Sequence, residues 1–134
     1  MDDCIFCRIV ARRAPAYVVA EDDATIVFLS LENHPLVVPK AHRPDVFALD
    51  DDLGAAIMRQ AIRVARAVRA GLGCDGVYLG QANGAAAGQD VFHFHLHVYP
   101  RWHDPPAWAT LTDEATKETT RARIAAKLRV MSDE

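Results

Sequence analysis

The stretch His93-Phe94-His95-Leu96-His97-Val98-Tyr99 alternates histidine with apolar residues and then ends on tyrosine. Successive side chains of a β-strand point to opposite faces, so the alternation predicts a strand from Val91 to Tyr99, ended by Pro100. On such a strand the three histidines share one face, each about 6.6 Å from the next, and the apolar residues face the core.

Three imidazoles on one face of a strand indicate chemistry, because a packed core would take valine or isoleucine there. A neutral imidazole is a nucleophile and a proton carrier near pH 7. Two alternatives stay open. The histidines could serve packing alone, or they could bind a metal that activates water, although Asp104 completes no familiar ligand cluster with them.

The segments around this strand predict an α+β domain with a five-stranded, mainly antiparallel sheet. Apolar runs predict its other strands at 16–20, 25–29, 36–38 and 77–79. Asp50-Asp51-Asp52 predicts the start of one long helix, which runs to about Ala70 and ends at Gly71 and Gly73. A C-terminal helix is predicted over about 111–130, with Thr112 as its N-cap.

The composition fits one globular domain over residues 1–134, opened by a Cys-x-x-Cys segment at 1–10. The chain is 51% hydrophobic and carries a formal net charge of −3. This charge disfavours nucleic acid as a partner, and no apolar run approaches the about 20 residues of a membrane span. The acidic residues before Cys4 are unlike a secretory signal, so we expect the cytoplasm and no membrane partner.

Cys4 and Cys7 have the spacing of a zinc half-site, for which two further ligands are needed. Two reduced cysteines without a metal are one alternative. A redox pair is the other, although no thioredoxin-like context surrounds them. The third cysteine, Cys74, is expected to be an inert small residue.

The residues from Asn83 to Asp90 are small or polar and include Gly84 and Gly88. Glycines and alanines allow backbone amides to approach an anion closely. A plain tight turn explains the composition equally well, and the case for an anion site comes from its position directly before the histidine strand.

The segment from Ala87 to Arg101 resembles the signature of the histidine triad family, and the resemblance extends to 33–42 and 4–10. It covers roughly residues 4 to 103. The resemblance implies the histidine triad fold and a homodimer whose pooled sheet has ten strands. It also implies a nucleotide hydrolase that cuts nucleoside phosphoramidates or dinucleoside polyphosphates at the α-phosphate.

The resemblance implies that His95 attacks the phosphorus to form a nucleotidyl-imidazole, and that His97 assists the leaving group. His34 would face the phosphate, and Gln89 with the amides near it would hold the phosphate oxygens. Four apolar residues offer a slot for a purine base, which we expect to be adenine, and core packing explains them equally well: Phe6, Ile9, Phe28 and Leu31. The expected substrate contacts are His34, Asn83, Gln89, Asp90, Phe28 and Leu31.

For the metal, the resemblance implies that His42 and His93 join Cys4 and Cys7 in a structural zinc site, and no organic cofactor is expected. Such a division would leave His95 and His97 for catalysis.

Three departures from the family pattern bear on activity. Asp90 stands where many members have serine or threonine, and a carboxylate there repels a phosphate. Ala82 replaces a frequent amide side chain. The turn before His34 is short, with Ser30 near the position of an aspartate that grips the ribose. A nucleotide-binding regulatory module with little turnover is therefore the alternative function.

Overall fold

The computed structural model describes residues 3–132, so the first two residues of the predicted segment 1–10 lie outside it. An antiparallel sheet of five strands forms the centre, in the order β1-β2-β3-β5-β4. The predicted α+β class and sheet are confirmed. The strands are β1 (Val18–Glu21), β2 (Thr25–Leu29), β3 (Pro35–Pro39), β4 (Gly76–Gly80) and β5 (Leu96–Arg101).

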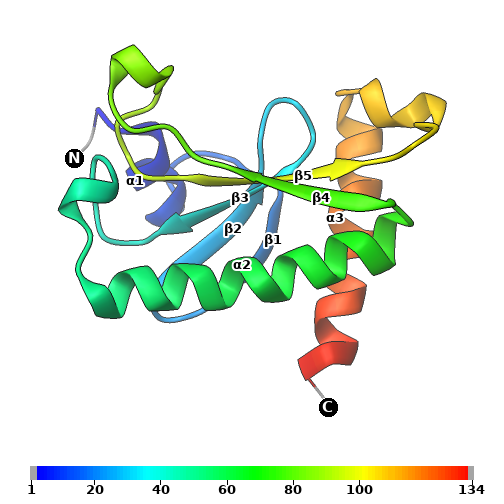
Figure 1. Cartoon of the computed structure of the whole chain (residues 1–134), viewed down its shortest axis with the longest axis horizontal. Coiled ribbons are helices and arrows are strands. Elements are labelled where there is room, and N and C mark those ends of the chain that lie inside the picture. The colour runs from blue at the N-terminus through cyan, green and yellow to red at the C-terminus, as the bar shows by residue number, and fades with distance from the viewer. Residues whose placement is uncertain (1–2, 133–134) are drawn as a thin grey trace.

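Helices cover both faces of the sheet (Figure 1). The long helix α2 (Asp51–Leu72) and the C-terminal helix α3 (Glu114–Ser132) pack on one face, in a core that includes Val37, Val64 and Ile124. The short helix α1 (Ile5–Val10) packs on the other. Three short 3₁₀ helices span Val46–Ala48, Ala85–Ala87 and Ala107–Thr110. None of the helices among the described residues is long and apolar enough to span a membrane.

Both ends of α2 follow from local chemistry. The carboxylate of Asp50 accepts a hydrogen bond from the Leu53 amide at 2.8 Å, which confirms the predicted N-cap. Gly73 ends the helix in the left-handed conformation at φ 65°. Gly71, predicted to help end the helix, lies inside it. A Cβ atom there would approach the Arg123 carbonyl oxygen to 2.8 Å, so this glycine allows α3 to pack closely.

Two other boundaries differ from the prediction, and one helix was not predicted. The first strand begins at Val18, where pairing with Phe28 starts, and not at residue 16. The C-terminal helix is capped by Asp113, whose carboxylate accepts from the Thr116 amide at 3.2 Å, and not by Thr112. The N-terminal segment forms α1. This helix was not predicted, because six residues are too few to show a helical period.

The histidine strand is shorter at its start and longer at its end than predicted. By hydrogen-bond pairing β5 begins at Leu96, so His93 and His95 lie in the irregular segment before it. The strand continues through Pro100 to Arg101. Its pairing with β3 involves only Leu96 and His97, so at Pro100 the neighbouring strand is β4 alone. Proline has no amide hydrogen to donate, and this is tolerated where a strand is paired on one side only.

Candidate functional site

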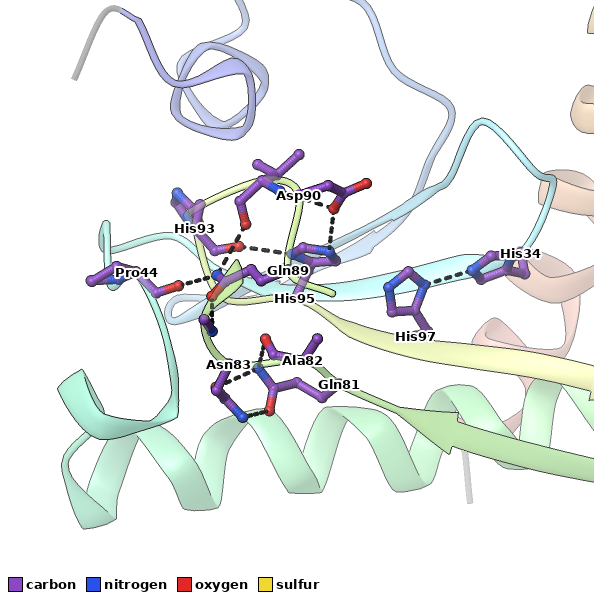
Figure 2. Close-up of polar contacts among 12 residues, drawn as sticks. His34, Pro44, Gln81, Ala82, Asn83, Gln89, Asp90, His93, His95 and His97 are labelled. Carbon is purple, nitrogen blue, oxygen red and sulfur yellow. Dashed lines mark hydrogen bonds and ion pairs between the residues drawn. The ribbon is translucent and has the colours of Figure 1, made fainter. Parts of the chain in front are cut away.

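The histidines gather on the sheet face that carries α1. Leu36 of β3 packs in the cluster around α1, and it pairs with His97 of β5. Strand periodicity places His34 and Tyr99 on the same face. The Phe6 ring of α1 packs edge-on against the His95 ring, with 5.1 Å between their centroids. Helix α1 therefore borders the histidines. Figure 2 shows the polar contacts that the histidines and the preceding loop make.

One ring nitrogen of His95 is held by the backbone. Nδ1 lies 2.8 Å from the carbonyl oxygen of His93, which can only accept, so Nδ1 carries the proton (Figure 2). In the neutral ring Nε2 then has a free lone pair. The residue is 8% exposed, so the ring is packed with its free nitrogen already defined. This geometry suits a nucleophile.

His34 and His97 form a pair beside it. The Nε2 atom of His34 lies 2.8 Å from Nδ1 of His97 (Figure 2). Burial, and then the charges of His97 and Arg101, lower the pKa of His34 to about 4. Burial and the neighbouring His95 lower the pKa of His97. Both rings are therefore neutral at pH 7, and one proton lies between their facing nitrogens.

The loop before the histidines is held by Gln89. Its side-chain oxygen accepts from the Gly84 amide at 2.7 Å, and its nitrogen donates to the carbonyl oxygens of Pro44 at 2.6 Å and Val91 at 3.1 Å. Gly84 and Gly88 have φ values of 91° and 94°, which favour glycine. Gln89 was expected to hold phosphate oxygens directly, but in this structure its amide shapes the loop.

Asn83 is also engaged within the protein. Its Oδ1 atom accepts from the Val46 amide at 2.7 Å. Oδ1 also accepts from Gln81, and Nδ2 donates to Gln81 at 2.6 Å (Figure 2). This paired amide arrangement anchors the loop to the segment before α2. A direct contact of Asn83 with substrate would require these bonds to open.

Asp90 lies beside the reactive nitrogen. Its Oδ1 atom accepts from the Val91 amide at 2.9 Å and lies 3.8 Å from Nε2 of His95 (Figure 2). The side chain is 85% exposed, so water screens this carboxylate and the side chain is free to turn. Asp90, the residue that departs from the family pattern, thus lies next to His95.

The two expected contacts of the base are not brought together. Phe28 is 3% exposed and packs edge-on against Phe6, with 5.2 Å between the ring centroids. Leu31 is 86% exposed in the turn between β2 and β3. Phe6 and Phe28 therefore pack against each other and leave no slot between them. Leu31 is exposed and could contact a ligand.

The four predicted metal ligands form a cluster. Single donor atoms of Cys4, Cys7, His42 and His93 all lie within 4.8 Å of one another. The Sγ atom of Cys7 is 3.3 Å from Nδ1 of His42 and 3.5 Å from Nδ1 of His93, and Sγ of Cys4 is 3.4 Å from the latter. Tetrahedral zinc bonds of about 2.3 Å to sulfur and about 2.0 Å to nitrogen put these atoms roughly 3.5 Å apart.

The chemistry of the donors also fits a cation. Nε2 of His93 donates to the Pro39 carbonyl oxygen at 2.8 Å, which leaves the lone pair of Nδ1 toward the two sulfurs. Burial and the adjacent Cys4 raise the pKa of the Cys7 thiol to about 11. Two thiolates this close need a positive charge between them, and a divalent metal supplies it.

Two residues of the site were not predicted to be site residues, although Ser30 was noted as standing near the position of an aspartate that grips the ribose. Tyr99 stacks on His97 with 5.1 Å between the centroids and 3° between the planes, and its centroid is 4.2 Å from that of His34. The two-residue period of the histidine strand could have placed it on this face. The Ser30 hydroxyl lies 3.0 Å from Nδ1 of His34, a contact that depends on the turn between them.

Fold and site together define a small α+β protein that holds a histidine with a free Nε2 atom, a neutral histidine pair and a Cys₂His₂ cluster on one sheet face. Residues 11–104 match the model of the HIT domain. The chain belongs to the histidine triad, or HIT, family, whose members are nucleotide-binding hydrolases and transferases.

Solved structures agree with this assignment. A zinc-bound histidine triad family protein from Mycobacterium smegmatis superimposes with a TM-score of 0.87 and 33% identity, over 99% of each chain. A hypothetical histidine triad nucleotide-binding protein from Sulfolobus tokodaii gives 0.90 and 26%, over 96% of this chain and 94% of that one. Adenylylsulfatase HINT3 of Arabidopsis thaliana is 33% identical over 113 residues, which are 81% of this chain and 57% of that protein.

Proposed function

We propose that this protein hydrolyses nucleoside phosphoramidates or dinucleoside polyphosphates at the α-phosphate, through a nucleotide bound covalently to His95. The observation that carries the proposal is the hydrogen bond from Nδ1 of His95 to the His93 carbonyl oxygen, which directs the free lone pair to Nε2. A nucleophile that is neutral and already oriented attacks at pH 7 without a separate strong base.

The reaction proceeds in two displacements. In the first, Nε2 of His95 forms a bond to the α-phosphorus while the bond to the leaving group breaks; His97 donates a hydrogen bond to the departing atom, which takes up a proton from solvent water. In the second, water attacks the phosphorus and loses a proton to the solvent, the bond to His95 breaks, and the nucleoside monophosphate is released with the His95 ring neutral again. His34 supports His97 through the 2.8 Å contact. We propose that backbone amides of this loop stabilise the phosphate oxygens; these are amides other than those of Gly84, Ala87, Gly88 and Gln89, which bond within the loop.

The choice of substrate class rests on the family and on two similar proteins. Adenylylsulfatase HINT3 acts, by its name, on an adenylyl compound, and the Sulfolobus tokodaii neighbour is named as nucleotide-binding. We therefore propose an adenosine-containing nucleotide as the substrate. The cytoplasm remains the proposed location, and the three cysteines, two of them three residues apart, are unlike a disulfide framework.

The direct test is a pair of steady-state assays, one with a fluorogenic adenosine phosphoramidate and one with diadenosine polyphosphates. We expect release of adenosine monophosphate from at least one of them. A specific observation favours the alternative of a binding module with little turnover, namely the Asp90 carboxylate 3.8 Å from the nucleophilic nitrogen. That alternative predicts tight binding of adenosine monophosphate, no turnover in either assay, and a gain of turnover in Asp90→Ser.

We further propose that Cys4, Cys7, His42 and His93 hold a structural zinc ion. The donor set and its spacing fit the metal, and the named Mycobacterium smegmatis neighbour is zinc-bound. Four protein ligands close a tetrahedral shell and leave no position for substrate. When bound, the ion ties α1 to the segment that carries the reactive histidines, and the chemistry at phosphorus belongs to the residues of this chain.

We also propose a homodimer with a continuous sheet of ten strands. β4 lies at one edge of the sheet and exposes Tyr78 and Leu79, and α2 exposes Met58 and Ile62. Edge strands that expose apolar side chains favour pairing with another chain. Light scattering at micromolar concentration should give a mass of about twice 14.7 kDa. The Leu79→Glu variant should give a lower mass. Leu111→Glu, at an exposed position outside this edge, is the control. A wild-type mass near 14.7 kDa would refute the dimer.

A further inference from the structure

The turn between β2 and β3 brings a serine to the histidine pair. The Ser30 amide donates to the His34 carbonyl oxygen at 2.8 Å, and the Asn33 amide donates to the Ser30 carbonyl oxygen at 3.1 Å. Asn33 adopts φ 66°, the left-handed residue that closes a three-residue hairpin loop. Because the loop is so short, the side chains of Ser30 and His34 meet on the face that carries the site.

The hydroxyl of Ser30 has three contacts among the described residues. Its oxygen accepts from the Glu32 amide at 3.1 Å and from the His34 amide at 3.3 Å. A hydroxyl has two lone pairs and one hydrogen, so both acceptor positions are used. We assign the third contact, 3.0 Å to Nδ1 of His34, as the one in which the hydroxyl donates; the Glu32 backbone, which raises the pKa of His34, is the competing hydrogen-bond partner of this ring.

The direction of this bond determines two further protons. If Nδ1 of His34 accepts, the neutral ring carries its proton on Nε2. That proton is donated to Nδ1 of His97 at 2.8 Å, so the proton of His97 is on its own Nε2. Burial of His34, which is 4% exposed, keeps its ring neutral and leaves it one proton to place.

We propose that Ser30 is a positioning residue that fixes the tautomers of His34 and His97, so that Nε2 of His97 is an N–H donor. Without the hydroxyl, His34 can carry its proton on Nδ1 and accept from His97, which then presents a bare lone pair. The polarity of His97 is thereby reversed. The consequence for the leaving group rests on the proposed function, whereas the tautomers themselves do not.

Two-dimensional NMR of histidine-labelled protein tests the tautomers without any substrate. Long-range ¹H–¹⁵N correlations distinguish a protonated ring nitrogen from a bare one. In the wild type we expect protonated Nε2 on both His34 and His97. We expect a mixture in Ser30→Ala and the wild-type pattern in Ser30→Thr, which keeps a hydroxyl. Protonated Nδ1 on wild-type His97 would overturn the proposal even if the alanine variant failed to fold.

Kinetics test the consequence. Ser30→Ala should lower kcat by roughly a hundredfold for a poor leaving group and much less for a good one, with KM little changed, because a hydrogen-bond donor matters most where charge builds up. Ser30→Thr should recover most of the rate. An unchanged tautomer and a kcat within about twofold in the alanine variant would refute the positioning role. A wild type inactive on both substrates refutes the proposed function, and the NMR result then decides the tautomers alone.

Discussion

Replacement of His95 by alanine will abolish turnover and leave binding of nucleoside monophosphate largely intact. The Nε2 lone pair of His95 is the proposed nucleophile, and no second displacement occurs without the covalent intermediate. Loss of a covalent nucleophile should reduce kcat by roughly three or more orders of magnitude. Steady-state assays measure the loss, and calorimetry with adenosine monophosphate measures the binding that remains.

His95→Asn is the matched variant, because an asparagine amide can still donate to the His93 carbonyl oxygen but has no nucleophilic nitrogen. It should bind nucleotide as the alanine variant does and should be equally inactive. Rapid quench of the wild type with a slow substrate should trap a nucleotidyl group, which peptide mass spectrometry places on His95. An active His95→Ala enzyme, or an adduct on His97, would contradict the mechanism.

Purified, untagged protein will contain about one zinc ion per chain, and removal of the ion will cost more stability than activity. Binding to the folded state alone stabilises it by mass action, and the cluster joins α1 to the segment of His93. We expect chelation to lower the melting temperature by roughly 10 °C or more, as a loss of several kcal/mol would in a domain of this size. Elemental mass spectrometry and thermal unfolding with and without chelator measure both quantities.

Cys4→Ser should lose the metal and show the lower melting temperature without any chelator. Cys74→Ser is the control, since this thiol is buried beside the Val68 carbonyl oxygen and is not a member of the cluster. Protein that stays metal-free after incubation with zinc would refute the site. Immediate loss of turnover on chelation, with no covalent adduct, would instead support the metal-bound water mechanism that the histidine pattern leaves open.

Local patterns in the sequence were sufficient for the fold class and for much of the site. The alternation around His95 predicted the face on which the histidines gather, because side-chain direction in an extended chain depends only on the residue's position. The Asp50 cap and the apolar spacing predicted α2 for the same reason. The metal cluster needed the family resemblance, since spacing alone identified only Cys4 and Cys7.

The sequence by itself thus determined the fold class, most of the elements and the face that the histidines share, all of which depend on residues close in the chain, and His95 stays the proposed nucleophile. Only the tertiary structure decided that β5 runs through Pro100, because this depends on which strands flank it. It alone showed that Gln89 shapes the loop, since its partners include Pro44, far away in the chain. The tautomers of His34 and His97 likewise depend on contacts between separate segments, and no periodicity in a sequence encodes a distance between segments.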